Sequence, residues 1–402
     1  MNKNSSYIID AVRTPIGKFG GALSTVRTDD LAAYVIKGLI NRVNINPEEI
    51  DDVMLGCANQ AGEDNRNIAR MALLLAGLPH SIPGETINRL CASGMSSVIH
   101  AHRAMEAGDG DVFLAGGVEN MTRGPWVISK ASTPFGRNSE MHDTSFGWRF
   151  INPKLDEKFG TESMGETAEN LVEKYDISRE DQDEFAYGSQ MKALSAQKNG
   201  RFNNEIISIE IPKRKSDPIL FKEDEFIKPQ STIEGLAKLK PAFKKNGSVT
   251  AGNSSGINDG AAVMLLASSL AVNKYGLKPL ARIISSAVIG LEPSLMGMGP
   301  VQASNKALQK AGLEISDMDV IELNEAFAAQ SIACIRQWGL DDDDPRINPN
   351  GGAIALGHPL GMSGTRILQT AAIELNKQNK SLALVTMCVG VGQGYAVIME
   401  KA

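Results

Sequence analysis

The sequence contains few residues of the kinds that bind metals or form disulfides. Its 402 residues include four cysteines and five histidines. The cysteines, at positions 57, 91, 334 and 388, lie far apart and form no CxxC pair, and the histidines show no ligand spacing. A structural zinc site is therefore not expected. In a reducing compartment such separated thiols stay free, so a special cysteine is expected to serve chemistry rather than structure.

Long apolar runs and a strong excess of one charge are also absent. No apolar run approaches the length of a membrane span, and residues 1–7 are polar, unlike a signal peptide. We therefore expect a cytoplasmic protein that does not enter membranes. The formal net charge of −6 gives no general attraction to nucleic acid or to anionic membranes. No phosphate-loop or dinucleotide-binding signature occurs.

Strands and helices alternate over much of the chain, which predicts an α/β fold with a mainly parallel sheet covered on both faces. At 402 residues the chain exceeds the size at which one core usually stops growing, so two or more domains are expected. Apolar patterns predict strands at 6–11, 51–57, 112–117, 260–267, 281–284, 319–323 and 382–387, and helices at 29–43, 65–76, 300–311 and 361–376.

The order of these elements recurs, which indicates two similar halves. Residues 48–55 resemble residues 316–323, and each half has a glycine-flanked reactive residue at a helix start, then a strand that ends in glycines. Between the halves lies a stretch that is richer in charge and proline and typical of an insertion over an active site. We predict an N-terminal half of residues 1–122 plus 247–276, a loop domain of residues 123–246, and a C-terminal half of residues 277–402.

Cys91 is the first candidate catalytic residue. It stands where a helix-periodic apolar segment begins, in the stretch Asn88–Met95. The free N–H groups and the dipole at a helix N-terminus stabilise a thiolate, so we expect an unusually acidic thiol. The alternative is a small buried residue, which is the usual role of a single cysteine.

Three further residues stand in comparable settings. His358 lies in a glycine-rich segment, Cys388 lies at a strand end before a glycine turn, and Asn324 follows a buried strand. Each of them also has an ordinary structural interpretation when it is taken alone. His358 could be a histidine in a turn, Cys388 a thiol in the core, and Asn324 a helix cap or an amide that holds a water molecule. Together with Cys91 they supply what covalent acyl transfer needs, namely a nucleophile, a base and a second proton carrier.

The motifs around Cys91, residues 116–121, residues 324–327, residues 357–359 and residues 388–390 resemble those of the thiolase family, in the family's order and over essentially the whole chain. The resemblance implies a thiolase fold, in which two βα halves pack as five layers (αβαβα) with an inserted loop domain. It implies an acyltransferase that cleaves 3-ketoacyl-CoA with CoA as cosubstrate and no permanently bound cofactor or metal. It also implies a homo-oligomer, specifically a tetramer built as a dimer of dimers.

The resemblance assigns a role to each candidate. Cys91, deprotonated by His358, would attack the 3-keto carbon, and Cys388 would protonate the departing acetyl-CoA carbanion. The N–H groups of Cys91 and Gly390 would form one oxyanion hole, and His358 with a water held by Asn324 the other. Four further residues match the family's positions less closely. Ser255 would contact the pantetheine arm of CoA, Lys228 would lie near the nucleotide phosphates of CoA, and Met164 and Phe327 would line the acyl pocket. The alternatives are ordinary loop residues for the first two and plain core for the last two.

Within the family, residues 56–67 and 147–153 look most like the 3-oxoadipyl-CoA thiolases. Some short-chain thiolases have histidine where this chain has Ser163, which argues against an acetoacetyl-CoA preference. An acyl chain that ends in a carboxylate needs a cation or several donors, and Arg149, followed by Arg66, is the candidate. Either arginine is alternatively a surface or subunit-interface residue. The competing functions are a broad 3-ketoacyl-CoA or acetoacetyl-CoA thiolase, a related decarboxylating ketosynthase, and a non-catalytic acyl-CoA or lipid carrier.

Overall fold

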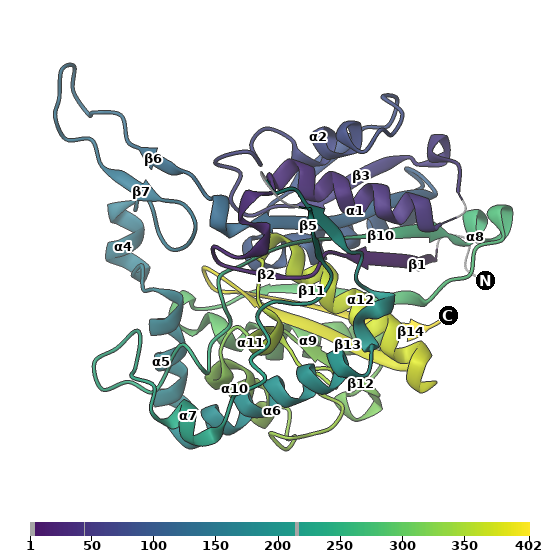
Figure 1. Cartoon of the computed structure of the whole chain (residues 1–402). Coiled ribbons are helices and arrows are strands. Elements are labelled where there is room, and N and C mark those ends of the chain that lie inside the picture. Colours follow the sequence, from purple (N-terminus) through teal and green to yellow (C-terminus); the bar gives the residue numbers. More distant parts are fainter. Residues whose placement is uncertain (1–4, 44, 214–216) are drawn as a thin grey trace.

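Two halves of similar topology form the body of the molecule (Figure 1). The computed structural model describes residues 5–43, 45–213 and 217–402. The N-terminal half contains β1 (Ser6–Arg13), β2 (Gly17–Lys18), α1 (Thr28–Arg42), β3 (Asp52–Gly56), α2 (Ile68–Leu75), β4 (Gly84–Ile87), α3 (Ser93–Ala107), β5 (Val112–Asn120), β10 (Asn258–Ser268) and α8 (Ser269–Tyr275). The C-terminal half contains β11 (Ala281–Gly290), α9 (Gly299–Ala311), β12 (Val320–Leu323), α10 (Ala328–Gln337), α11 (Ala353–Leu356), α12 (Leu360–Gln378), β13 (Leu382–Val389) and β14 (Gln393–Lys401).

The strand order confirms that the halves repeat. It runs β12-β13-β14-β11 in one half and β3-β5-β10-β1 in the other, with β4 beyond β3. Corresponding strands pair in the same direction, since β3 is parallel to β5 as β12 is to β13, and the other pairs are antiparallel. A short pairing of β1 with β11, at Tyr7 with Arg282 and Ile8 with Ala281, joins the two halves.

The prediction of a mainly parallel sheet was wrong. Only the β3–β4, β3–β5 and β12–β13 pairs are parallel among the described strands. In the C-terminal half, β14 follows β13 through the tight turn at residues 390–392 and must therefore run back beside it. In the N-terminal half, β10 enters the sheet only after the long insertion and lies antiparallel to both β1 and β5.

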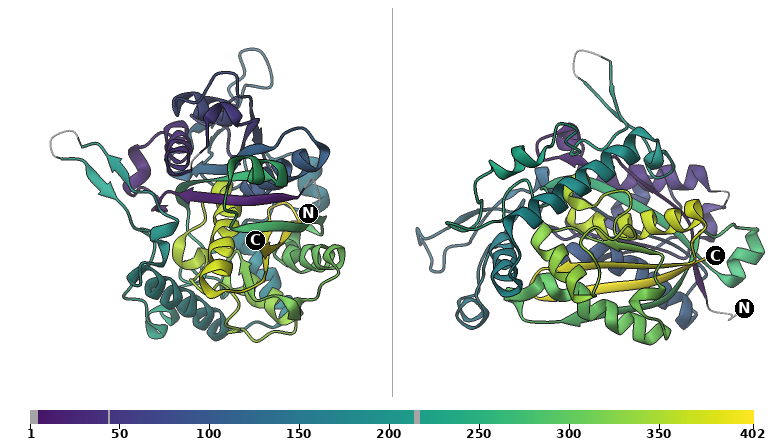
Figure 2. Two further views of the ribbon diagram at one scale, coloured as in Figure 1. Left: turned by 90° about the vertical axis from the view of Figure 1, so that its right-hand side faces the viewer. Right: turned by 90° about the horizontal axis from the view of Figure 1, so that it is seen from below.

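Three apolar clusters define five layers (Figures 1 and 2). One cluster lies between α1, α2 and the outer face of the N-terminal strands, and another lies between α9, α10 and the outer face of the C-terminal strands. The third lies between the two sheets and includes α3 and α12, which pack against each other. The predicted αβαβα arrangement is therefore confirmed. Because α12 is covered on every side, its residues 361–375 are all buried.

The described part of the insertion consists of helices and two small hairpins. It contains β6 (Trp126–Ile128), β7 (Met141–Asp143), α4 (Pro153–Phe159), α5 (Met164–Tyr175), α6 (Arg179–Lys198), β8 (Ile209–Ile211), β9 (Ile219–Phe221) and α7 (Ile233–Ala237). The β8–β9 hairpin packs on the α1 side of the N-terminal half. The β6–β7 hairpin projects away from the body (Figure 1). No helix in the described residues combines the length and the apolar character needed to cross a membrane.

Candidate active site

The starts of α3 and α12 meet between the two halves. Cys91 lies in a 3₁₀ turn, Leu90–Ala92, immediately before α3, and His358 lies two residues before α12. That turn packs against both α12 and β13, the strand that carries Cys388. A β-carbon on Gly117 or on Gly94 would overlap the carbonyl oxygen of Gly361, so glycine is required for this close approach. The structure thus brings together the Cys91 turn, the His358 helix and the Cys388 strand.

The backbone around Cys91 is held in an uncommon conformation. Leu90 has a φ of 47°, which is rare for a bulky residue, and Val391, next to Gly390, has a φ of 59°. The Asn88 side chain accepts the N–H of Leu90 at 2.9 Å, and Ser93 Oγ accepts the N–H of Arg89 at 2.9 Å. Such conformations persist only where the surroundings enforce them, and they concentrate at functional sites.

The structure contradicts the expectation that Cys91 is unusually acidic. Burial raises the pKa of Cys91 to about 11, although the backbone N–H groups of Gly390 and Cys91 favour the thiolate and lower it. The expectation rested on the helix start alone, whereas the desolvation of the thiolate has the larger effect in this setting. Cys91 is therefore a neutral thiol at rest, and it could act as a nucleophile only if a base removed its proton.

His358 is a neutral imidazole with an unprotonated ring nitrogen. Ser363 Oγ donates to the Pro359 carbonyl at 2.8 Å, and the same oxygen lies 2.7 Å from His358 Nδ1. Since a hydroxyl has only one hydrogen, Nδ1 must carry the proton, which leaves the lone pair on Nε2. Burial and the positive charge of Arg366 lower the pKa of His358 to about 3, so the ring is neutral.

Asn324 lies beside the same ring. Its Nδ2 is 3.5 Å from His358 Nε2, and its Oδ1 is buried with no hydrogen-bond partner among the described residues. A buried amide oxygen in this position is suited to hold a water molecule near the imidazole. The backbone N–H of Asn324 donates to the Thr386 carbonyl at 3.0 Å, which fixes the residue against β13.

Cys388 is enclosed by apolar side chains. It is 2% exposed and packs in a cluster with Met164, Phe327 and Phe243. Burial raises the pKa of Cys388 well above its ordinary range, and a thiolate at Cys91 would raise it further. Cys388 is therefore a protonated thiol close to Cys91, and a protonated thiol can act as an acid.

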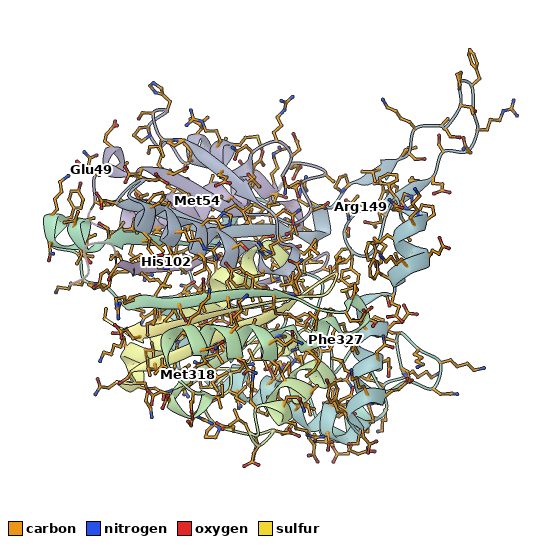
Figure 3. All side chains as sticks on the ribbon, turned by 180° about the vertical axis from the view of Figure 1, so that it is seen from behind. Glu49, Met54, His102, Arg149, Met318 and Phe327 are labelled. Carbon is orange, nitrogen blue, oxygen red and sulfur yellow. The ribbon has the colours of Figure 1, made fainter. Side chains whose placement is uncertain are left out.

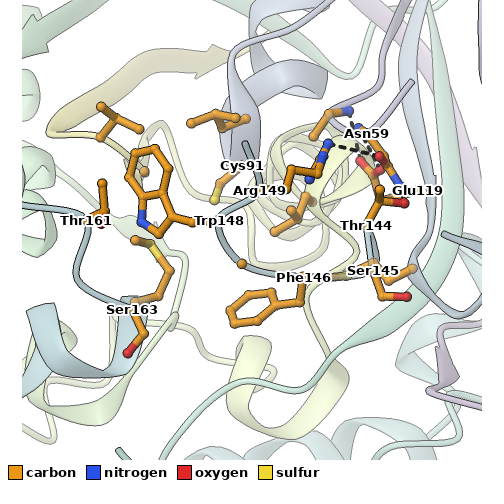
Figure 4. A pocket seen from close by; sticks show the side chains of 18 of the residues that line it. Asn59, Cys91, Glu119, Thr144, Ser145, Phe146, Trp148, Arg149, Thr161 and Ser163 are labelled. Atoms are coloured by element: carbon orange, nitrogen blue, oxygen red, sulfur yellow. Dashed lines mark hydrogen bonds between the residues drawn. The ribbon is translucent and has the colours of Figure 1, made fainter. Parts of the chain in front are cut away.

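A cavity of about 660 Å³ opens beside Cys91. Its walls come from the N-terminal half, the insertion and the 390–391 turn, and they include Cys91, Gly390, Met164, Arg149 and Trp148 (Figure 4). Ser163, another lining residue, caps α5, because its hydroxyl accepts the N–H of Glu166. The combined site therefore offers a thiol nucleophile, a neutral base, a second thiol and a space for an organic substrate.

Comparisons with known proteins agree over the whole chain. Residues 6–269 match the thiolase N-terminal domain, and residues 277–401 match the thiolase C-terminal domain. The chain belongs to the thiolase family. It is 55% identical over 397 residues to the 3-oxoadipyl-CoA/3-oxo-5,6-dehydrosuberyl-CoA thiolase of Escherichia coli strain K12, with 98% of this chain and 99% of that protein covered.

Two solved structures show the same thiolase architecture. The acetyl-CoA acetyltransferase of Bacillus anthracis has a TM-score of 0.92 at 41% identity, and human mitochondrial 3-ketoacyl-CoA thiolase has a TM-score of 0.92 at 39% identity. Each comparison covers 99% of both chains. The predicted family and fold class are therefore confirmed.

The structure places the other predicted residues of this thiolase in different surroundings. Arg149 lines the Cys91 cavity, whereas Arg66 is exposed and is not among the lining residues. Figure 3 shows Arg149 on the insertion near the projecting hairpin and Phe327 on the C-terminal half. Phe327 is 7% exposed and packs edge-to-face with Phe243 at 6.0 Å between ring centroids.

Ser255 and Lys228 lie near each other through Phe226. The Phe226 ring packs against Gly256, the residue after Ser255, and the Lys228 ammonium lies 4.8 Å from the same ring. The N–H of Ser255 donates to the Ala326 carbonyl at 2.9 Å, two residues from Asn324. Burial lowers the pKa of Lys228, and no carboxylate pairs with it in the described structure.

Sequence analysis did not find the role of Glu119. Its buried carboxylate accepts the N–H groups of Ala58 at 2.9 Å, Asn59 at 3.1 Å and Gly361 at 2.9 Å, and so ties β5 to the start of α12. Burial raises its pKa to about 7 against the opposing effect of these donors. The residues that Glu119 binds are distant from it in the sequence, so the sequence does not reveal these contacts. The one available signal was that Glu119 lies within the 116–121 motif.

Glu119 also belongs to the one group of potential metal ligands found among the described residues. One ligand atom each of Cys57, Asp64 and Glu119 lie within 4.8 Å of one another, and all three residues are buried. Backbone N–H groups already occupy the Glu119 oxygens, and Asp64 accepts the N–H of Gly62 at 2.8 Å. We therefore interpret this group as structural support for the loop that lines the cavity.

Proposed function

We propose that this thiolase cleaves 3-ketoacyl-CoA substrates through an acyl-enzyme on Cys91. The observation that carries the proposal is the convergence of the Cys91 turn, which lines the cavity, with the start of α12 after neutral His358 and with the strand of protonated Cys388. No single one of these features would suffice, because buried thiols and histidines are common in cores.

In the proposed first half-reaction, His358 Nε2 accepts the Cys91 proton as sulfur attacks the 3-keto carbon. The C2–C3 bond then breaks, and its electron pair passes to the α-carbon of the departing acetyl-CoA, where Cys388 delivers a proton. In the second half-reaction Cys388 recovers a proton from the thiol of a new CoA, and that thiolate displaces the acyl group from Cys91. His358 returns its proton to the departing Cys91 thiolate, so that all three residues regain their starting protonation states.

Backbone and side-chain donors would stabilise the negative oxygen in each step. The Cys91 and Gly390 N–H groups stand at the nucleophile, where the ketone oxygen becomes an alkoxide. His358 and a water held by Asn324 would stabilise the enolate oxygen of the thioester. These assignments extend the family's mechanism to residues whose surroundings fit them.

The proposed substrate is 3-oxoadipyl-CoA, which would yield succinyl-CoA and acetyl-CoA. This choice is supported by the relative at 55% identity, whose name includes that substrate, and by the arginine in the acyl cavity. CoA would enter past Ser255, with Lys228 near its phosphates, because Gly256, which follows Ser255, and Lys228 both lie against the Phe226 ring. Met164 would contact the acyl chain, with Phe327 behind it beside Cys388.

We further propose a homotetramer assembled as a dimer of dimers. The β6–β7 hairpin projects from the body and exposes Trp126, Ile128 and Met141, which are 70%, 67% and 62% exposed. Apolar side chains gathered on a projecting arm are typical of a subunit contact. A cytoplasmic location remains a prediction.

The function is tested by following CoA-dependent loss of the 3-keto absorbance with 3-oxoadipyl-CoA, 3-oxohexanoyl-CoA and acetoacetyl-CoA. We expect the highest kcat/KM with 3-oxoadipyl-CoA. Comparable values for all three substrates would instead favour a broad-specificity thiolase. Binding of CoA without cleavage of any of them would favour the non-catalytic carrier.

A further inference from the structure

We propose that Arg149 and Asn59 form a subsite that binds the terminal carboxylate of a dicarboxylic acyl chain. The inference rests on the proposed thiolysis and specifies which chemical class of acyl group the cavity accepts. Arg149 is therefore proposed as a specificity-determining residue that contacts the substrate far from the bond that breaks.

Arg149 shares one cavity with the nucleophile. Both Arg149 and Cys91 line the 660 Å³ space, and Figure 4 shows the arginine side chain directed toward Asn59. The guanidinium Nη2 donates to Asn59 Oδ1 at 3.1 Å. Asn59 in turn donates from Nδ2 to Thr144 Oγ1 at 3.2 Å, so its oxygen is oriented toward the arginine. The amide thus holds the guanidinium without neutralising its charge.

The charge of Arg149 is not compensated within the chain as described. No carboxylate oxygen lies within 4.0 Å of its guanidinium, and the bond to Asn59 is its one hydrogen bond there. A guanidinium presents several N–H donors in a planar fork that matches a carboxylate. A half-buried arginine with free donors and no acid is therefore suited to receive an acid from a ligand.

Two acidic residues also line the cavity, and both are occupied. The oxygens of Glu119 accept backbone N–H groups from Ala58, Asn59 and Gly361. The carboxylate of Glu166 accepts the N–H of Ser163 at 2.7 Å, as part of the cap of α5. Neither side chain pairs with Arg149, so the positive charge remains available in the cavity.

The loop that carries Arg149 is fixed on both sides. Two residues anchor the chain before Arg149. Thr144 Oγ1 donates to the Pro125 carbonyl at 2.7 Å, and the Trp148 indole donates to the Glu162 carbonyl at 3.1 Å. Phe150, with a φ of 51°, packs edge-to-face on His142 at 4.8 Å between ring centroids. A specificity residue needs such support, because a loosely held cation discriminates poorly.

The cavity that Arg149 and Cys91 share can receive a short methylene chain. Trp148, Met164 and Leu90 supply apolar lining. A chain of two methylenes that ends in a carboxylate, as in a succinyl group, combines an apolar stem with one anion. The cavity presents the same combination in complementary form.

The test compares kcat/KM for 3-oxoadipyl-CoA and for 3-oxohexanoyl-CoA, which has a methyl group in place of the carboxylate. Arg149→Gln is expected to lower the value for 3-oxoadipyl-CoA by about 10²-fold, because the substrate carboxylate loses its charged partner. The value for 3-oxohexanoyl-CoA is expected to change by less than about threefold. Arg66→Gln, at an exposed arginine outside the cavity, is the matched control and should preserve the wild-type ratio.

A second measurement uses the wild-type enzyme alone, so that it does not depend on the folding of a variant. Esterifying the terminal carboxylate of 3-oxoadipyl-CoA with a methyl group should reduce kcat/KM to about the level of the neutral substrate. An unchanged substrate ratio in Arg149→Gln, or equal cleavage of acid and ester, would overturn the carboxylate subsite and leave thiolysis intact. Absence of cleavage of every substrate by the wild type would overturn the proposed function itself.

Discussion

Replacing Cys91 with alanine is expected to lower thiolysis by at least about 10⁴-fold, since loss of the nucleophile removes the covalent route altogether. Alanine occupies nearly the same space at the start of α3, so the fold should be retained. The measurement is the rate of CoA-dependent cleavage of 3-oxoadipyl-CoA, with binding of CoA followed separately by calorimetry. CoA should still bind, because the sulfur of Cys91 is not part of the proposed CoA contacts.

Cys334→Ala is the matched control for this variant. Cys334 is a buried cysteine of α10 within the apolar cluster of the C-terminal half, and it does not line the cavity. Its Sγ donates to the Gly297 carbonyl. Its replacement should leave the cleavage rate close to that of the wild type. Substantial residual cleavage in Cys91→Ala would mean that another group attacks the substrate, and the mechanism would have to be abandoned.

Replacing His358 with glutamine is expected to lower kcat by about 10²–10⁴-fold, the usual contribution of a positioned general base. Glutamine can still donate a hydrogen bond, but it cannot accept the proton of a thiol whose pKa burial has raised to about 11. Single-turnover cleavage should therefore slow at the first chemical step. His100→Gln, at a half-buried histidine on α3, serves as the control.

The pH profile gives a further check on His358. A base with its pKa lowered to about 3 is neutral above that pH and charged below it, so mildly acidic conditions should not protonate it. We expect kcat/KM to show no loss attributable to this imidazole between neutral and mildly acidic pH. A loss centred near the ordinary histidine pKa, and absent in a variant at position 358, would show that the ring is not held neutral as described.

The sequence predicted the reactive groups better than their electrostatics. Cys91, His358, Cys388 and Asn324 could be selected because each stands at a strand or helix end within a glycine-rich motif. The acidity of Cys91 was predicted wrongly because a helix start is a local feature, whereas desolvation depends on the packing of distant segments. No periodicity in residues 88–95 records that burial.

The fold likewise has features that local sequence patterns predict and features that depend on distant segments. The two halves were predicted from the recurring order of strands and helices, whereas the five layers were implied by the family resemblance. Strand direction is not encoded in that pattern, and β10 and β14 pair antiparallel only because of how the insertion and the 390–392 turn return the chain. The glycines at 94, 117 and 361, which allow the helix starts to meet, are recognisable only once their neighbours are known.

The central claim is that Cys91 carries the acyl group between the two half-reactions. The most direct measurement is to mix the enzyme with 3-oxoadipyl-CoA in the absence of free CoA, quench rapidly, and locate any added mass by peptide mass spectrometry. The account predicts a succinyl group on Cys91, release of one equivalent of acetyl-CoA, and loss of the adduct when CoA is added. Release of acetyl-CoA without an adduct, or an adduct on Cys388 with Cys91 unmodified, would contradict it.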